Sequence, residues 1–243
     1  MDRKRQAFLL ALPASLVLLI FFIVPMVYIL VKTIVENGFA DFVEFFTDPF
    51  YLDILWTTIR VSLISTFVSL VLGYPTAYFM ARTKSRMKKV MIIIILFPFL
   101  VSAVVRSYGW MVLLGTKGLV NQLLTGLGLI AKPLKMLNTE FAVIVGMIHL
   151  LIPYMVLALL GVLQSIDPNV EYAAYSLGAN PLQTFAKVVF PLSTPGIISG
   201  CVLVFTMSMT SYVTPKLLGG SKFRMMATMV VQEINVSFDW GAA

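Results

Sequence analysis

Five long apolar stretches dominate the sequence, and none of them contains an Asp or a Glu. A helix needs about 20 apolar residues to cross the hydrocarbon core of a bilayer, and each stretch is long enough. Backbone polar groups cannot stay unpaired in lipid, so such stretches are predicted to be helical. The sequence therefore predicts an all-α, polytopic helical bundle in a membrane, with spans at about 7–34, 56–81, 90–114, 141–163 and 194–215.

The composition argues against a soluble protein and against a nucleic-acid partner. Hydrophobic residues make up 59% of the chain and charged residues 12%, whereas soluble domains carry about 25% charged residues. A net charge of +7 would favour nucleic acid in a soluble protein. Here the basic residues form short clusters between apolar stretches, so the charge is better explained by orientation in the lipid bilayer.

The connections between the spans differ in the sign of their charge. The first connection, from Glu36 to Asp53, carries only acidic residues, and the second, from Arg82 to Lys89, carries only basic ones. Basic loops stay in the cytoplasm. We therefore expect a multi-pass inner-membrane protein with a cytoplasmic N-terminus and a cytoplasmic loop at residues 164–193. Three lysines of the longer outer loop depart mildly from this rule: Lys117, Lys132 and Lys135.

The loop at residues 164–193 carries strong signals for two short helices. Asp167-Pro168 is typical of a helix start, and Gly178 is typical of a helix end in the left-handed conformation. Asn180 and Gln183 have the spacing of a capping box, which predicts a second helix. Pro191 and Pro195 are expected to end that helix and lead into the fifth span. The apolar face of the first helix is predicted to contain Val170, Ala173, Ala174 and Leu177.

Two interpretations of this loop compete. An amphipathic helix lying on lipid headgroups favours several Lys or Arg on its polar face and bulky apolar residues on the other. The two helices contain one base, Lys187, and have alanines at the centre of the apolar face. Small residues allow another protein to approach closely, so the composition favours docking of a protein partner.

The same residues resemble a known motif. Glu171-Tyr172-Ala173-Ala174-Tyr175-Ser176-Leu177-Gly178 is similar to the EAA motif of permease subunits in binding-protein-dependent ABC importers. The family pattern is Glu-Ala-Ala, three residues, Gly, nine residues and Ile-x-Leu-Pro. The two alanines, Gly178 and Pro191 keep this spacing, while Val188 and Phe190 replace Ile and Leu. Tyr172 occupies the glutamate position, and Glu171 lies one residue earlier.

Further segments resemble the spermidine/putrescine-type branch of this family. They are Gly73-Tyr74-Pro75-Thr76-Ala77-Tyr78, Arg106-Ser107-Tyr108-Gly109-Trp110, Gly118-Leu119-Val120-Asn121, Leu151-Ile152-Pro153-Tyr154 and Thr214-Pro215-Lys216-Leu217-Leu218-Gly219-Gly220. The resemblance implies one permease domain over residues 1–243 with the type I ABC importer permease fold, in the bacterial inner membrane. That fold has six spans, so five are expected to be present here and the sixth to be missing.

The resemblance also implies the partners. They are a dimer of ABC ATP-binding subunits, a second permease subunit and a periplasmic solute-binding protein, with a polyamine as the solute carried inward. The chain has no Gly-x-x-x-x-Gly-Lys-Ser/Thr motif, so ATP and Mg are expected on the partner ATPase and no cofactor on this chain. The residues implied in ATPase docking are Glu171, Tyr172, Ala173, Ala174, Leu177, Gly178, Val188 and Pro191.

Six residues are candidates for lining the translocation pathway. Aromatic rings can stack on a cationic amine, but rings near span ends also form the interfacial belt. Hydroxyls in a span can line a pathway or bond between helices. Both interpretations stay open for Tyr108, Trp110, Tyr154, Ser208, Ser211 and Tyr212.

Other classes of membrane protein lack the residues they need. A proton-coupled secondary transporter usually relies on carboxylates inside its spans, and the five spans have none, although sodium coupling stays open. The single cysteine, Cys201, and the single histidine, His149, leave no catalytic or metal site to build, so no enzyme is expected. His149 is expected to bond to a backbone carbonyl between helices, and a functional role is the alternative.

Overall fold

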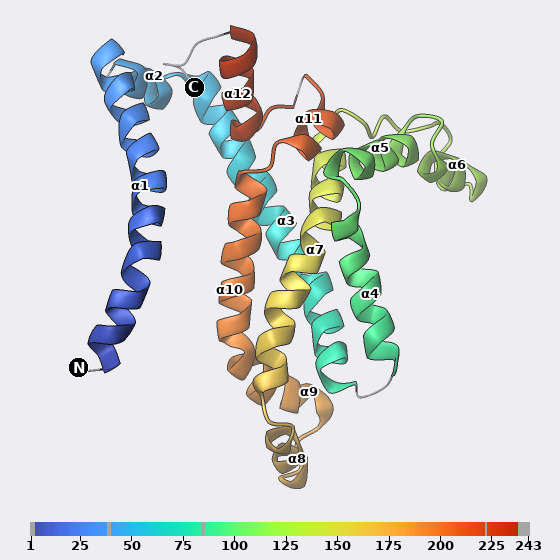
Figure 1. Cartoon of the computed structure of the whole chain (residues 1–243). Helices are drawn as coiled ribbons and strands as arrows, with labels where there is room; N and C mark the ends of the chain where they lie inside the picture. The colour runs from blue at the N-terminus through green and yellow to red at the C-terminus, as the bar shows by residue number, and fades with distance from the viewer. Residues whose placement is uncertain (1–2, 38–39, 84–85, 222, 238–243) are drawn as a thin grey trace. The chain divides into compact units, whose positions relative to one another are not determined.

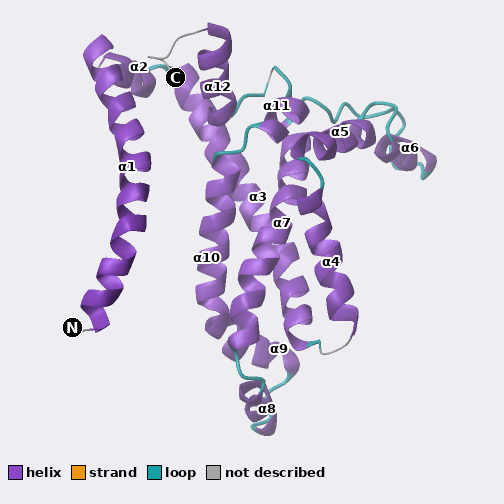
Figure 2. Cartoon of the chain, in the orientation of Figure 1, coloured by secondary structure: helices purple, strands orange, loops and turns teal. Residues whose placement is uncertain are grey.

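The computed structural model describes residues 3–37, 40–83, 86–221 and 223–237, and these are helical apart from their connections, with no strand (Figure 2). The contacts group into two units, residues 1–52 with 230–243 and residues 53–229, which are considered separately. The first unit holds α1 (Arg3–Asn37), α2 (Ala40–Thr47) and η2 (Glu233–Ser237), a π-helix. Helix α1 continues through Pro13 and Pro25 without a break.

The second unit is built on three long helices, α3 (Pro49–Arg82), α7 (Glu140–Ser165) and α10 (Phe190–Met209), of which α3 begins in the first unit. Its remaining helices are α4 (Arg86–Leu100), α5 (Ala103–Leu114), α6 (Leu119–Gly126), α8 (Asn169–Ser176), α9 (Pro181–Thr184), η1 (Phe185–Val189), α11 (Val213–Gly219) and α12 (Met226–Gln232), the last of which ends beyond it. Figure 1 shows α7 at the centre, flanked by α3, α4 and α10.

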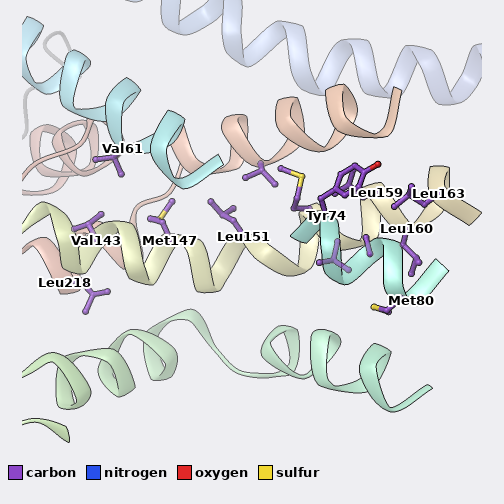
Figure 3. Packing of buried hydrophobic residues seen from close by; sticks show 14 of the residues in the cluster. Val61, Tyr74, Met80, Val143, Met147, Leu151, Leu159, Leu160, Leu163 and Leu218 are labelled. Carbon is purple, nitrogen blue, oxygen red and sulfur yellow. The ribbon is translucent and has the colours of Figure 1, made fainter. Parts of the chain in front are cut away.

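The core of this unit follows α7. Side chains at four-residue intervals are completely buried, which places them on one face of the helix. Figure 3 shows this face meeting Val61, Tyr74 and Met80 of α3. Glycines bring α10 close: a Cβ on Gly200 would lie 2.9 Å from Met155 Sδ. The buried face consists of Val143, Met147, Leu151, Met155, Leu159 and Leu163.

The third predicted span, 90–114, is not one helix. The chain bends by 98° between Arg86–Leu100 and Ala103–Gly126. Ser102 caps the new helix, with its Oγ accepting from Val104 N at 3.3 Å. Arg106 Nη1 donates to Pro98 O at 2.8 Å, so a carbonyl at the end of α4 is paired across the break. The apolar composition continues through the break, which explains why the sequence predicts a continuous span.

The fifth predicted span, 194–215, is displaced toward the N-terminus. The observed helix runs from Pro181 to Met209, and α11 is a separate helix after it. Pro191 and Pro195 do not end the preceding helix, as expected from the sequence, but lie in the first turns of α10. In the π turn before them, Phe190 N bonds to Phe185 O. This local change of hydrogen-bond register joins α9 to α10.

The number of spans agrees with the sequence at its upper value. In the described part of the chain, four helices are long and apolar enough to cross a membrane. A fifth crossing is counted if the bent pair of α4 with α5 and α6 forms one broken span. Counted in this way, the third crossing is a broken span, whose second half turns across the bundle (Figure 1).

Candidate functional site

The 164–193 loop folds as the two capped helices predicted from its sequence. Asp167 Oδ1 accepts from Asn169 N at 2.9 Å at the start of α8. Gly178 has φ +85°, and Ala179 N bonds back to Ala174 O, which closes the end of the helix. The predicted capping box of Asn180 and Gln183 is present in both directions, at 2.8 and 3.0 Å. The end of α8 at Gly178 and the start of α9 at Asn180 are therefore both fixed by hydrogen bonds, which gives the turn between the two helices a defined shape.

The outer surface of the loop is apolar and exposed. The side chains of Tyr172, Leu177 and Leu182 are 65%, 89% and 75% exposed. Ala173, Gly178 and Pro191 are also exposed, and Val188 is half-buried. Five of the eight docking residues predicted from sequence therefore lie at the surface, and Leu182 joins them although the sequence analysis did not select it.

Glu171 and Ala174 face the opposite way and are buried. Arg82, the last residue of α3, contacts the Glu171 carboxylate through Nε at 2.6 Å and Nη2 at 2.5 Å from Oε1. Tyr78 donates its hydroxyl to Glu171 Oε2 at 2.9 Å. The carboxylate closest to the EAA position thus binds inside the chain rather than on the exposed surface.

The second half of the loop also contacts α3. The ring of Phe185, in the π turn, lies 5.5 Å from that of Tyr74 and 6.0 Å from that of Tyr78, both nearly edge to face. The Tyr74 hydroxyl is 2.7 Å from Ser193 Oγ. Residues 74–82 of α3 therefore hold both arms of the loop, one by charge and one by aromatic packing.

The six pathway candidates do not form one cluster. Tyr108 is exposed on α5, and Tyr154 on α7 packs edge to face against Phe99 at 4.7 Å. Ser211 and Tyr212 lie in the break between α10 and α11, outside either helix. Ser208 Oγ is buried on α10 and has no hydrogen-bond partner among the described residues.

The remaining candidate, Trp110, has a specific partner. Its Nε1–H donates to His149 Nδ1 at 3.0 Å, and the two rings are nearly perpendicular. This bond joins α5 to α7 just beyond the bend. His149 was expected to bond a backbone carbonyl, but it instead accepts from an indole. Among the described residues, no three His, Cys, Asp or Glu side chains lie close enough together to hold a metal ion.

Sequence reasoning did not identify Arg82 and Tyr78 as site residues. Arg82 was counted only as part of a basic loop, and Tyr78 only as part of a family segment. The available signal was chemical: Glu171 is the only carboxylate within the two helices of the loop, and Arg82 is the basic residue at the very end of an apolar span. The sequence does not show that Tyr78 and Arg82 contact Glu171, because this contact requires α3 and α8 to lie together in the folded chain.

The fold and this loop define the class of protein. The permease architecture of a bacterial alginate ABC transporter, solved with a bound periplasmic protein, matches 99% of this chain and 86% of that chain. The TM-score is 0.75 at 18% identity, which establishes the fold alone. The chain has the type I ABC importer permease fold.

The chain belongs to the family described as binding-protein-dependent transport system inner membrane component, whose profile matches residues 69–243. It is 33% identical over 232 residues to the spermidine/putrescine transport system permease protein PotB of Haemophilus influenzae, covering 92% of this chain and 81% of that protein. The Escherichia coli K12 protein of the same name is 37% identical over 199 residues, covering 81% and 72%. This chain is therefore a multi-pass inner-membrane transport subunit and not itself an enzyme.

Proposed function

We propose that the chain is the transmembrane subunit of an ATP-driven importer that carries a polyamine, of the spermidine or putrescine type, from the periplasm to the cytoplasm. The names of the two relatives support this substrate class. Its coupling to ATP hydrolysis would occur through the 164–193 loop. The observation that carries the proposal is the apolar, exposed surface of two capped helices at one end of the bundle.

The loop has the properties that docking to an ATPase requires. Tyr172, Leu177 and Leu182 offer exposed apolar area. The buried core of an interface is more apolar than the rest of a protein surface, and tyrosine is enriched there. The caps around Gly178 hold the two helices in one arrangement, so little order has to be created when a partner binds. ATP and Mg would be held by that partner, since this chain has no phosphate-binding loop motif.

Closure of two such ATPases would move the docked loops as nearly rigid bodies. The loop leads directly into α10 through the π turn, and its inner side is bound to α3. Movement of the loop would therefore reach two spans of this subunit. A second permease subunit would supply the other side of the pathway, and alternating access would follow from their relative movement.

The polyamine substrate also agrees with the charge of the chain. A polyamine is a cation, and the connection from Glu36 to Asp53 contains five acidic residues and no basic one. That connection would attract the solute or a basic surface of the periplasmic binding protein. The five spans hold no carboxylate pair for two ammonium groups, so the binding protein would provide most of the selectivity.

Purification of the assembled transporter tests the proposal. We expect the chain to co-purify with an ATP-binding subunit, and proteoliposomes with the binding protein to take up labelled spermidine only with ATP. Gly178→Arg places a long charged side chain at a left-handed position of the docking surface, and should abolish both. Gly178→Ala introduces the same backbone strain without the bulk. If Gly178→Arg keeps both the ATPase and the uptake, docking by this loop is wrong.

A further inference from the structure

Arg82 joins three elements at one point. Its guanidinium binds the Glu171 carboxylate of α8, and its Nη1 also donates to Leu163 O at 3.1 Å and Ile166 O at 3.3 Å at the end of α7. The guanidinium also lies 5.9 Å from the centre of the Tyr78 ring. One side chain of α3 therefore holds the end of α7 and the first helix of the loop.

Most of this cluster is removed from solvent. The Arg82 side chain is 20% exposed and that of Glu171 is 10% exposed. A buried ion pair gives little net stability compared with apolar packing, but removing one partner leaves a charge without compensation. The planar guanidinium also fixes the direction of each bond, which a flexible lysine would not do. The cluster is thus better suited to fixing the position of α8 than to stabilising the fold.

Tyr172 follows Glu171 in α8 but lies outside the cluster of Arg82, Tyr78 and Glu171. Tyr172 is 65% exposed on the outer side of α8, whereas Glu171 faces α3. Consecutive helix residues point about 100° apart, so adjacent residues can lie on different faces of the helix. The exposed side of α8 is therefore free for a partner without disturbing the carboxylate.

We propose that Glu171, Arg82 and Tyr78 are positioning residues that transmit movement of the 164–193 loop to α3 and α7, and that they do not contact the ATPase. This proposal rests on the proposed function, because it requires that the loop be driven by an ATPase. It assigns docking and transmission to different faces of one short helix. The two functions should then be separable by mutation.

Glu171→Gln tests the separation because it removes the charge and keeps the size of the side chain. In the assembled transporter we expect normal co-purification of the ATPase and continued ATP hydrolysis. ATP-driven uptake of spermidine should fall roughly tenfold, within the usual range of coupling between sites. Tyr78→Phe, which removes a single hydroxyl, should change uptake in the same direction by a smaller factor.

The chain offers a matched control at the other end of the same two helices. Arg60 of α3 and Glu140 of α7 form an ion pair at 2.5 Å, with side chains 45% and 30% exposed. The double substitution Arg60→Gln with Glu140→Gln removes this pair and leaves the loop untouched. Exposed pairs contribute little. Uptake by this variant should stay within about twofold of the wild type.

Exchange of the two charges distinguishes positioning from simple loss of structure. Arg82→Glu combined with Glu171→Arg restores an ion pair, although not the two bonds to the α7 carbonyls. We expect the double variant to take up severalfold more spermidine than Arg82→Glu alone, at equal amounts in the membrane. Independent effects of the two substitutions in such a cycle would overturn the proposal.

The remaining outcomes separate this proposal from the proposed function. If the wild-type chain carries no ATPase, the proposed function itself fails. If Glu171→Gln reaches the membrane in normal amounts but loses the ATPase, Glu171 belongs to the docking surface and only the positioning role is overturned. Unchanged uptake by Glu171→Gln overturns it as well. If Glu171→Gln does not reach the membrane, uptake by Tyr78→Phe decides: a decrease with the ATPase retained supports the proposal, and no change overturns it.

Discussion

Gly118 lies in the short turn between α5 and α6 and directly precedes α6. A Cβ at this position would lie 2.4 Å from the carbonyl oxygens of both Val112 and Leu113. These obstacles are backbone atoms of a helix, so they cannot rotate away as a side chain could. Gly118 N also bonds to Gly115 O at 2.8 Å, which holds the turn against α5.

Gly118→Ala should therefore destabilise the folded chain. Overpacking usually costs about 1–3 kcal/mol, and an immovable backbone places this substitution toward the upper value. The expected result is a lower melting temperature of the purified protein in detergent. Gly126→Ala is the control, because a Cβ there has nothing within 4 Å. Equal melting temperatures for the two variants would contradict the argument.

At residue scale the segment from Glu171 to Gly178 also shows where sequence reasoning stopped. The end of the first helix at Gly178 could be predicted from the sequence, because caps and helix ends depend on residues a few positions apart. The role of Glu171 could not be predicted, because its partner Arg82 is 89 residues away in the chain. Tyr172 occupies the glutamate position of the motif and is exposed, while the adjacent glutamate is used internally.

The capping box at Asn180 is the feature that starts the second arm of the loop. Asn180 Oδ1 accepts from Gln183 N, and Gln183 Oε1 accepts from Asn180 N. Helix α9 is the four-residue first segment of a helix that continues through the π turn into α10. The first N–H groups of this helix have no partner within it, so the cap supplies their partner.

Asn180→Ala should loosen this arm by about 1 kcal/mol, the usual cost of losing an N-cap. Amide hydrogen exchange of residues 181–189 should then be roughly fivefold faster. Asn180→Asp keeps the acceptor oxygen and should exchange at nearly the wild-type rate. The role of the cap would be refuted if the alanine and aspartate variants exchange at the same rate.

Two other elements show how local signals can mislead. Pro191 and Pro195 were expected to end a helix, yet the helix continues through both. Pro191 lies in the first turn of α10, directly after the π turn, whereas Pro195 lies inside the helix and is tolerated there although an interior proline removes one backbone bond. The break after Leu100 was not predicted, because the apolar run continues through it. Its cause is a set of contacts by Ser102 and Arg106 that only the folded chain displays.

At the scale of the whole molecule, the second unit has two different ends. Figure 1 shows α8 and α9 at the same end as the start of α4, and α6 at the opposite end. Of the described residues, Arg82, Arg86, Lys88 and Lys89 lie where α3 is joined to α4 at the first end, and Lys117, Lys132 and Lys135 lie in the connections on either side of α6 at the opposite end. The positive-inside rule gives more weight to the cluster and predicts that the first end is cytoplasmic.

Labelling of single cysteines tests this orientation. In a Cys201→Ala background, Lys132→Cys should react with a membrane-impermeant maleimide in spheroplasts, whose inner membrane is intact. Arg86→Cys should react only after the membrane is permeabilised, because the predicted orientation places this residue on the cytoplasmic side. Both substitutions replace an exposed basic residue, so each serves as the control for the other. The opposite pattern would invert the predicted orientation.

The sequence by itself determined that this chain is a helical membrane protein, where the first and fourth of its apolar helices lie within a few residues, and that the 164–193 loop contains two capped helices. These features depend on lipid solvation and on contacts a few residues apart, so they are encoded locally. Only the tertiary structure decided the 98° bend after α4, the continuity of α9 with α10 and the burial of Glu171 against Arg82. The Glu171–Arg82 pair joins residues 89 apart in the chain, and which face of a helix becomes buried is fixed only by what packs against it. The bend and the π turn use closer contacts, by Ser102 and Arg106 and from Phe190 N to Phe185 O, but these are displayed only by the folded backbone.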